Sequence, residues 1–400
     1  MINFCRHCNS SLNESVIDLG HQPPSNAYLT KDELNLPETT YPLKVYICTK
    51  CWLMQLPEHA SSKELFKADY AYFSSTSKSW CAHAKYFVDY AIKKLDLNSK
   101  SYVVEIASND GYLLQYMQRE SIPCLGIEPT HATANASILK GISTLEKFFD
   151  SELANNLRKA DLIIANNVLA HVPNIRDFVK GISILLKSNG QVSIEFPHLL
   201  KLLNLNQFDT IYHEHYSYLS LIFVQKLFSE YDLEIIDVNE ISTHGGSLRV
   251  WIGKKGVFQI SNNVQNILTL EKLANLENLD SYLGFQKRAE LAKYQLIDFL
   301  IQAKKENKKV LGYGAAAKGS TFLNYAGIKS DLLPAIADSA KSKQGLFMPG
   351  SHIPIITPEE FYLENCQNVL ILSWNLLKEF KEILNGKTLI TAIPKLQIWN

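Results

Sequence analysis

The central part of the chain is constrained most by four short apolar segments, each of which ends in polar residues. They are residues 102–106, 124–127, 161–165 and 191–194. Helical sequence follows the first segment, and an alternation of strands and helices predicts a parallel β-sheet. Such sheets bind their ligands outside the carboxyl ends of the strands. We therefore expect functional residues directly after these strands.

Acidic and small polar residues occupy those strand ends. Glu105 closes the first strand and Glu128 lies 23 positions later, near the spacing of about 20 at which a carboxylate reaches a nucleotide ribose. Ala107 and Asn109 replace glycines of a dinucleotide-binding turn, which disfavours close approach of a pyrophosphate. The pattern favours S-adenosylmethionine, with a turn that binds no ligand as the alternative. The residues predicted to bind this cofactor are Glu105, Ala107, Ser108, Asn109, Gly111, Glu128, Pro129, Asn166 and Asn167.

The sheet is expected to end in an antiparallel pair of strands. Residues 233–238 and 247–252 are both apolar, and residues 239–246 between them leave no room for a helix. This arrangement is similar to the class I methyltransferase sheet, whose last strand runs antiparallel to its neighbours. The predicted fold is therefore a Rossmann-like α/β methyltransferase domain.

Two C-x2-C pairs lie in the first part of the chain. Each pair directs two thiolates to one point, so the two pairs supply the four ligands of a tetrahedral zinc site. A closed set of four protein ligands predicts a structural metal and not a catalytic one. The alternative is two reduced pairs without metal. The predicted ligands are Cys5, Cys8, Cys48 and Cys51.

Residues 207–218 concentrate histidine, carboxylate and phenol groups, among them Tyr212, His213, Glu214 and His215. Histidine titrates near neutral pH, so this composition favours acid–base chemistry. A metal-binding pair of histidines and a structural polar loop are the alternatives. His171 follows the end of the third strand, where it either faces the same site or packs in the core.

The C-terminal part contains a second α/β unit after a helical region. The strand 310–313 leads into small residues, including Gly314, and then into Lys318 at the start of a helix. Backbone N–H groups at such a turn can bind an anion, and the lysine adds positive charge. We therefore predict that Gly314 and Lys318 bind a diphosphate. The alternative is a Rossmann-like unit that serves only packing.

Eight segments in this order resemble the sugar C-methyltransferases that act on nucleotide-linked 4-keto-deoxyhexoses. Besides the paired cysteines they are residues 22–28, 69–75, 105–111, 166–173, 212–215, 243–247 and 312–319. The resemblance implies S-adenosylmethionine and structural Zn²⁺ as cofactors and a nucleotide-diphosphate sugar as substrate. It also implies an N-terminal zinc-binding domain, a central methyltransferase domain and a C-terminal α/β domain.

The same resemblance assigns roles to individual residues. His215 would be the base, Tyr212, Glu214 and His171 would line the active site, and a tyrosine of the stretch 69–75 would join them. We expect this to be Tyr72, rather than Tyr70, because it directly precedes Phe-Ser-Ser. Asn26, in the stretch 22–28, is expected to contribute to substrate binding.

These roles predict methylation of a carbon next to a ketone, at C3 of the sugar. His215 would remove the proton, and Glu214 would hold its ring and raise its basicity. Tyr212, Tyr72 or His171 would donate hydrogen bonds to the enolate oxygen. Methylation of another carbon, or of a sugar oxygen or nitrogen by the same base, remains open, as does the base of the nucleotide.

The predicted boundaries are 1–65 for the zinc-binding domain, 66–258 for the methyltransferase domain, 259–308 for a helical connector and 309–400 for the C-terminal domain. A nicotinamide-dependent oxidoreductase and a non-enzymatic zinc-domain adaptor are the competing functions. The replaced glycines and the antiparallel strands argue against the first. The titratable groups of residues 212–215 argue against the second.

The charge composition limits the partners of the chain. Lysine and arginine total 40, as do aspartate and glutamate, so the formal net charge is zero. Without a basic field, no nucleic-acid partner is expected. No apolar run approaches the roughly 20 residues of a membrane span, and no signal peptide is visible. We expect a cytoplasmic protein without membrane association, as a monomer or weak homo-oligomer.

Overall fold

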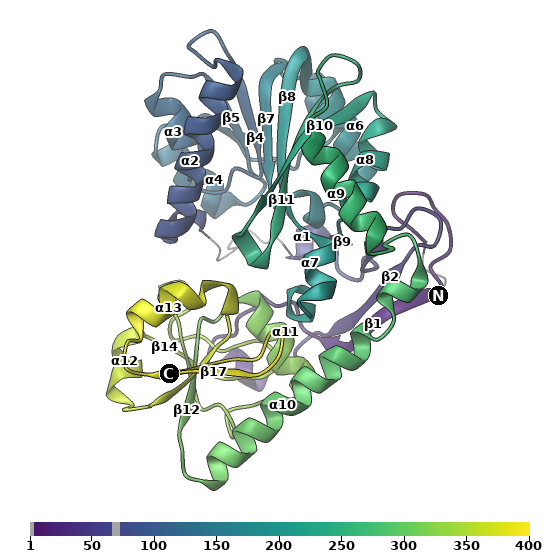
Figure 1. Cartoon of the computed structure of the whole chain (residues 1–400). Helices are drawn as coiled ribbons and strands as arrows, with labels where there is room; N and C mark the ends of the chain where they lie inside the picture. Colours follow the sequence, from purple (N-terminus) through teal and green to yellow (C-terminus); the bar gives the residue numbers. More distant parts are fainter. Residues whose placement is uncertain (1–3, 66–72) are drawn as a thin grey trace.

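The computed structural model describes residues 4–65 and 73–400, which form three β-sheets with their helices (Figure 1). The seven-stranded sheet lies in the upper half of Figure 1, the C-terminal sheet lies below it, and the small N-terminal sheet lies at the side of both. Within the described ranges, no helix is long and apolar enough to cross a membrane.

The N-terminal sheet is antiparallel and has the order β1-β2-β3-β9. Its first three strands come from the start of the chain, whereas β9 follows the histidine-rich segment and pairs with β3. In β2 every second side chain is buried, as expected of a strand with one face in a core. A short helix, α1 (Ser62–Leu65), follows. The strands are β1 (Glu14–Gln22), β2 (Tyr41–Ile47), β3 (Met54–Gln55) and β9 (Ser217–Tyr218).

The central sheet has the order β10-β11-β8-β7-β4-β5-β6, in which β11 runs antiparallel to both neighbours. The other neighbouring pairs, from β8 to β6, are parallel. The sequence-based prediction of a class I methyltransferase sheet with a terminal antiparallel pair is thus confirmed. The strands are β4 (Val103–Ile106), β5 (Cys124–Ile127), β6 (Thr144–Leu145), β7 (Ala160–Asn166), β8 (Leu186–Pro197), β10 (Leu233–Ile241) and β11 (Ser247–Lys254).

Helices cover both faces of this sheet, so its strands are apolar on both sides. Val103 and Leu162 pack in one core with α2 and α3, while Val104 and Ile163 pack in another with α5, α6, α8 and α9. This explains the continuous apolar segments of the parallel strands. The helices around the sheet are α2 (Lys78–Leu95), α3 (Leu114–Arg119), α4 (His131–Leu139), α5 (Ser151–Asn155), α6 (Ile175–Leu185), α7 (Leu199–Asn204), α8 (Leu221–Ser229) and α9 (Asn262–Leu273).

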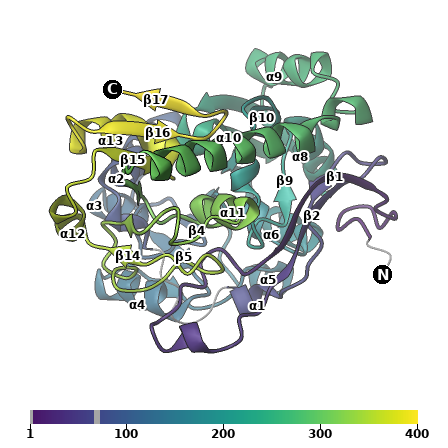
Figure 2. The same ribbon diagram turned by 90° about the horizontal axis from the view of Figure 1, so that it is seen from below.

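The C-terminal sheet has the order β14-β13-β12-β15-β16-β17, with only β17 antiparallel to its neighbour among these strands. Seen from below, α11 lies beside α10 and close to the strands of the N-terminal sheet (Figure 2). The elements are α10 (Phe285–Lys305), β12 (Val310–Tyr313), α11 (Ala317–Ala326), β13 (Ile336–Ala337), β14 (Ile355–Ile356), α12 (Pro358–Leu363), β15 (Asn368–Ile371), α13 (Leu377–Ile383), β16 (Thr388–Thr391) and β17 (Gln397–Trp399).

One hydrophobic core joins the N-terminal sheet, the C-terminal domain and the segment that precedes the histidine-rich residues. Val45 of β2, Phe208 and Ile211 of that segment, and Phe322 of α11 all belong to it. Burial of this apolar surface holds the three parts together. The segment that precedes the candidate base is therefore anchored where the N-terminal sheet and the C-terminal domain meet.

Candidate active site

The four cysteines of the two C-x2-C pairs come together, with all Sγ atoms within 4.8 Å of one another. Both pairs use the same turn: the N–H of Asn9 donates to the Cys5 carbonyl and the N–H of Trp52 to the Cys48 carbonyl. Zinc–sulfur bonds of about 2.3 Å in a tetrahedron place sulfurs about 3.8 Å apart. The Cys5–Cys51 and Cys8–Cys48 distances of 3.5 Å fit a tetrahedral zinc ion.

The turn after β4 has a backbone that glycine usually adopts. Ala107, Asn109 and Gly111 all have positive φ, at 55°, 50° and 73°. A Cβ atom at Gly111 would lie 2.4 Å from Cδ1 of Ile142, so only glycine fits there. The turn keeps the conformation of a glycine-rich turn although two of its glycines are replaced.

The carboxylate of Glu128, at the end of β5, is held by backbone groups of this region. Its oxygens accept hydrogen bonds from the N–H of Asn109, at 2.9 Å, and from the N–H of Thr130, at 3.0 Å. Ser108 is fully buried, and its hydroxyl packs against Gly126 of β5. Pro129 is half-buried beside Glu128.

Four predicted cofactor residues carry buried polar atoms without a hydrogen-bond partner among the described residues. They are Oε2 of Glu105, the hydroxyl of Ser108, Oδ1 of Asn166 and the side-chain amide of Asn167. Burial, with nearby Glu128 and Asp110, raises the pKa of Glu105 well above its ordinary value. Buried polar groups normally have partners. These acceptors suit the hydroxyls and ammonium group of S-adenosylmethionine, so the residues present fit this cofactor.

A segment before α2 covers the same turn, and sequence reasoning missed its role. The N–H of Ser74, in the 3₁₀ turn η2 (Ser74–Thr76), donates to Oδ1 of Asn109 at 2.9 Å. Asp110 accepts from the hydroxyl of Ser75 and from Nζ of Lys140, the latter at 3.1 Å. The predicted residue Tyr72 lies outside the described residues, as does Tyr70.

His215 is held in one tautomer. Its Nδ1 lies 2.9 Å from the carbonyl oxygen of Thr210, in η4 (Phe208–Thr210). A carbonyl oxygen only accepts, so Nδ1 carries the proton and Nε2 is the acceptor nitrogen. The Tyr212 hydroxyl lies 2.8 Å from Nε2. The ring thus presents a basic nitrogen next to a phenol donor.

Burial lowers the pKa of His215 well below its ordinary value, and the electrostatic interaction with His171 acts in the same direction. The two imidazole rings are 4.6 Å apart between centroids. Burial also lowers the pKa of His171 to about 4. The 3₁₀ turn η3 (Leu169–His171) is held to this loop because the N–H of Tyr216 donates to the carbonyl of Ala170. Both histidines are therefore neutral at neutral pH.

The expectation that Glu214 holds the ring of His215 is wrong. Glu214 is buried, and its two oxygens accept from the hydroxyl of Ser25 at 3.0 Å and from Nδ2 of Asn26 at 2.9 Å. The carbonyl of Thr210 holds the ring in its place. Because Glu and His are adjacent in the chain, their side chains leave the loop in different directions. Glu214 instead ties the loop to the N-terminal residues.

Lys318 lies at the C-terminal side of the site. Its ammonium group donates to Oδ1 of Asn375 at 2.8 Å and lies 4.7 Å from the centroid of the Trp374 ring. Burial lowers its pKa to about 8, while the charge of Asp209 opposes the shift. The charge of Lys318 also contributes to the low pKa of His215.

The turn that contains Gly314 is less open to an anion than the sequence suggests. Gly314 has a φ of 86°, and a Cβ there would lie 2.8 Å from Oγ of Ser373. The next backbone N–H, of Ala315, already donates to the carboxylate of Asp338 at 2.7 Å. Lys318 is therefore the stronger of the two predicted anion ligands.

A buried charge cluster lies beside the carboxyl ends of the parallel strands in the central sheet. It was not predicted from the sequence. Glu195, near the end of β8, accepts from Nε of Arg249 at 2.6 Å and contacts Nε2 of His83 at 3.0 Å. Its backbone carbonyl accepts from the N–H of Asn167 at 2.7 Å. The cluster thus links α2, β8 and β11 to a predicted cofactor residue. The sequence signal that could have identified Glu195 is its position as an acid at a strand end, like Glu105 and Glu128.

Together, the site can transfer a proton in a shielded environment. It contains a neutral imidazole with an unprotonated Nε2, a phenol that donates to this nitrogen, a second neutral imidazole and an ammonium group. Enolate formation requires an unprotonated base and pre-arranged hydrogen-bond donors. Asn26 was predicted to bind substrate. Its side-chain amide instead donates to Glu214, so it supports the histidine-rich loop.

Family comparisons agree with this description of the fold. Residues 5–66 match a family described as a zinc binding domain, residues 80–238 a methyltransferase domain and residues 242–394 a C-methyltransferase C-terminal domain. The chain belongs to the S-adenosylmethionine-dependent C-methyltransferases that carry an N-terminal zinc-binding domain. Its predicted cofactors are thereby confirmed, and the oxidoreductase and adaptor alternatives are set aside.

Among curated proteins, the chain is similar to the C-methyltransferase NovU of Streptomyces niveus. The two are 31% identical over 404 residues, which is 98% of this chain and 96% of NovU. Solved structures align with a smaller part. Magnesium protoporphyrin IX methyltransferase of Synechocystis PCC 6803, with bound SAH, is 13% identical, with a TM-score of 0.36 over 44% of this chain and 83% of that chain. The PH0226 protein of Pyrococcus horikoshii OT3 is 12% identical, with a TM-score of 0.37 over 46% and 95%.

Proposed function

We propose that this C-methyltransferase methylates C3 of a nucleotide-linked 4-keto-deoxy sugar after His215 removes the proton at that carbon. The observation that carries the proposal is the fixed tautomer of His215, whose Nδ1–H donates to Thr210 and whose Nε2 is the base. A carbon acid needs such a base, because carbon, unlike oxygen or nitrogen, is not nucleophilic before deprotonation.

In the proposed reaction, Nε2 of His215 takes the proton, and the electrons of the C–H bond form the enolate. The hydroxyl of Tyr212, 2.8 Å from Nε2, is placed to turn its proton to the developing oxyanion. His171, on the neighbouring turn, would line the site beside the His215 ring, with 4.6 Å between the ring centroids. Bound S-adenosylmethionine would supply the electrophilic methyl group, whose bond to sulfur breaks as the bond to the enolate carbon forms, leaving S-adenosylhomocysteine. His215 holds the removed proton as an imidazolium until solvent takes it.

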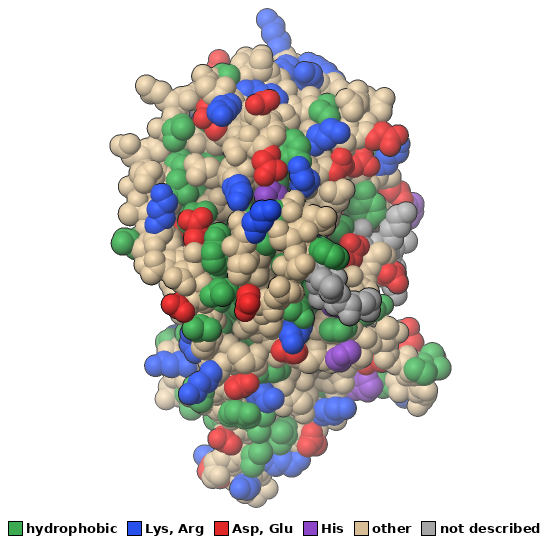
Figure 3. Space-filling view, turned by 90° about the vertical axis from the view of Figure 1, so that its right-hand side faces the viewer, with side chains coloured by type: hydrophobic (Ala, Val, Ile, Leu, Met, Phe, Trp, Pro, Cys, Tyr) green, Lys and Arg blue, Asp and Glu red, His purple; other side chains and the backbone are tan. Residues whose placement is uncertain are grey.

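Other residues would bind and position the two ligands. Glu105, Asn166 and Asn167 have buried polar atoms that can hold the cofactor. Lys318 would pair with a diphosphate oxygen, since it is a buried cation whose charge acts on His215. Glu214 would keep the loop in place through Ser25 and Asn26. The surface in view mixes acidic and basic side chains, consistent with the zero net charge, so attraction of an anionic sugar nucleotide depends on local groups such as Lys318 (Figure 3).

The test is product analysis with a panel of thymidine and guanosine diphosphate 4-keto sugars and methyl-¹³C-labelled S-adenosylmethionine. We expect the label on C3 by NMR. A label on oxygen or nitrogen, or no methylation of any panel member, would contradict the proposal.

Variants then separate the roles. His215→Asn should abolish both methylation and exchange of the C3 proton in D₂O with S-adenosylhomocysteine present. His131, an exposed histidine that contacts Glu146, offers the matched control His131→Asn, which should keep both activities. Near-normal turnover of His215→Asn would show that another group is the base.

A further inference from the structure

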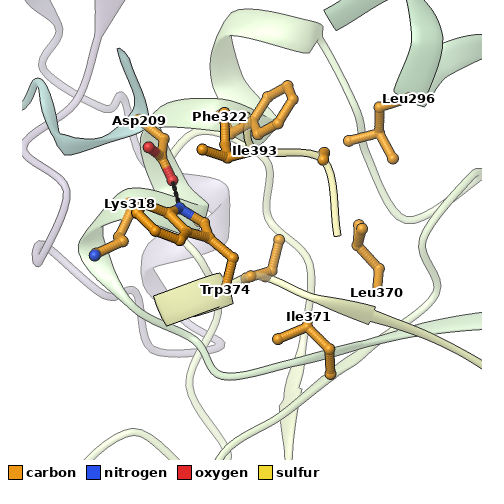
Figure 4. Close-up of a pocket in the computed structure, with 11 residues that line it drawn as sticks. Asp209, Leu296, Lys318, Phe322, Leu370, Ile371, Trp374 and Ile393 are labelled. Carbon is orange, nitrogen blue, oxygen red and sulfur yellow. Dashed lines mark hydrogen bonds between the residues drawn. The ribbon is translucent and has the colours of Figure 1, made fainter. Parts of the chain in front are cut away.

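Trp374, at the start of the 3₁₀ turn η7 (Trp374–Leu376), makes a direct contact with the segment that carries the base. Its indole Nε1–H donates to Oδ2 of Asp209 at 2.6 Å (Figure 4). Asp209 is 1% exposed, so this carboxylate has little access to water. A buried carboxylate that loses a hydrogen-bond donor is costly. The contact therefore fixes the position of Asp209.

Asp209 directly precedes Thr210, whose carbonyl holds Nδ1 of His215. The C-terminal domain also contacts the residues on either side, Phe208 and Ile211. The ring of Phe208 packs edge-on against Phe322 of α11, with 5.0 Å between centroids. The hydroxyl of Thr321 donates to the carbonyl of Ile211 at 2.9 Å. A displacement of η4 would thus move the acceptor of the His215 proton.

The indole itself is fixed from the opposite side. The hairpin between β10 and β11 approaches so closely that a Cβ atom at Gly245 would lie 2.3 Å from Cη2 of Trp374. The carbonyl of Gly245 also accepts from Nε2 of Gln207, the residue before η4. Trp374 therefore lies between the hairpin of the central sheet and the segment that positions the base.

We infer that Trp374 is a positioning residue for His215. By binding Asp209, Trp374 fixes the neighbouring Thr210 carbonyl. That carbonyl keeps the His215 ring in its Nδ1–H tautomer. The effect of this residue on catalysis rests on the proposed function, in which Nε2 removes the substrate proton. The hydrogen bond chain runs from the C-terminal domain to the base without touching substrate. It gives that domain a part in proton transfer, beyond the binding of a nucleotide sugar.

A competing role for Trp374 is to hold Lys318, whose ammonium group lies over its ring. The variant Trp374→Phe separates the two roles, because it keeps an aromatic face and removes the N–H. If Trp374 positions the base, kcat falls by about 10- to 100-fold, as for loss of one hydrogen bond to a charged group, and KM stays within about threefold. If it serves only Lys318, kcat is unchanged and the inference is wrong.

Variants of Asp209 identify the path. Asp209→Asn keeps an oxygen that accepts the indole N–H and should retain kcat within about threefold, whereas Asp209→Ala should match Trp374→Phe. The double variant Trp374→Phe, Asp209→Ala should lose no more than about threefold beyond either single variant, because both changes break the same contact. Additive losses would overturn the inference.

A second readout needs no substrate. ¹⁵N NMR of histidine-labelled full-length enzyme, with the His215 signals assigned by His215→Asn, reports which ring nitrogen carries the proton. Wild type should show one tautomer with the proton on Nδ1, and Trp374→Phe and Asp209→Ala should show a mixture. An unchanged His215 signal in both variants would overturn the inference. If wild type methylates no panel sugar, the proposed function fails, and this measurement still decides the role of Trp374.

Trp399 provides the matched control. It belongs to the same domain, and its Nε1–H also donates to a side chain, Oγ1 of Thr391, at 3.1 Å. Trp399→Phe removes an indole N–H outside the active site, so kcat and the His215 tautomer should not change. A kcat loss in Trp399→Phe equal to that of Trp374→Phe would show a general effect of the domain and overturn the inference.

Discussion

The ion pair between Arg249 and Glu195 allows a quantitative test of what holds the carboxyl ends of the central strands together. The side chains are 5% and 0% exposed, and Nε of Arg249 donates to Glu195 at 2.6 Å. The variant Arg249→Met keeps most of the side-chain volume beside Phe87 and removes the charge. It leaves Glu195 buried with His83 as its remaining side-chain partner.

Removing one partner of a buried ion pair costs about 3–5 kcal/mol, because the other charge stays buried and uncompensated. We expect this loss in the free energy of unfolding of Arg249→Met at neutral pH. Adding Glu195→Gln should recover at least half of it, since no buried charge then remains. Urea unfolding followed by tryptophan fluorescence gives both values, and equal slopes against urea would show that the same surface unfolds.

The dependence on pH has a definite sign. Burial alone would raise the pKa of Glu195, but His83 and Arg249 overcome it and hold the pKa below its ordinary value. In wild type this stabilisation is present above the unfolded pKa and is lost as the pH falls through the folded pKa. Without Arg249, burial dominates and the folded pKa rises. The variant's deficit should therefore be smaller at about pH 5.5 than at about pH 7.5.

The exposed pair of Lys85 and Asp89, on the same helix as His83, gives a control. Lys85→Met should leave the unfolding midpoint unchanged, because exposed pairs contribute little. An Arg249→Met protein within about 1 kcal/mol of wild type would refute the reasoning, since the pair would then be exchanging with water.

Three further outcomes follow from the site. Cys8→Ser should lower both the melting temperature and the amount of bound zinc, measured by atomic emission. Cys81→Ser is the control and should keep the metal. Equal zinc in both variants would contradict a four-cysteine site. Ala107→Gly should relieve a positive φ and so raise the free energy of unfolding by about 1 kcal/mol. Urea unfolding measures this change, and a lower free energy of unfolding would contradict backbone strain at Ala107. Because burial lowers the pKa of Lys318 to about 8, KM for the sugar nucleotide should rise up to roughly tenfold per pH unit above that value, and Lys318→Met should raise KM at neutral pH and remove this rise.

The sequence alone predicted the elements whose signal is local. Apolar segments bounded by polar residues identified β4, β5, β7 and β8, and the short link 239–246 identified the antiparallel pair of β10 and β11. The paired cysteines identified the zinc site because spacing alone brings each pair to one point. In each case the residues that determine the structure are neighbours in the chain.

The contacts that orient the base could not be predicted in this way. The partner of His215 Nδ1 is a backbone carbonyl, which any residue at position 210 would provide. Ser25 and Asn26 meet Glu214 across most of the N-terminal half of the chain, and Trp374 meets Asp209 across most of the rest. No alternation or spacing encodes such pairs. The predicted domain boundaries, the site assignments and the oligomeric state stay predictions.

The pairing of β9 with β3 also has a consequence for the order of synthesis. The strands β1, β2 and β3 leave the ribosome early, but Ser217 and Tyr218 emerge only after all the parallel strands of the central sheet. Until then the edge of β3 lacks its partner, and an unpaired edge invites pairing with other chains. Because β9 begins two residues after His215, pairing of β9 with β3 also brings the loop with the candidate base against the N-terminal sheet.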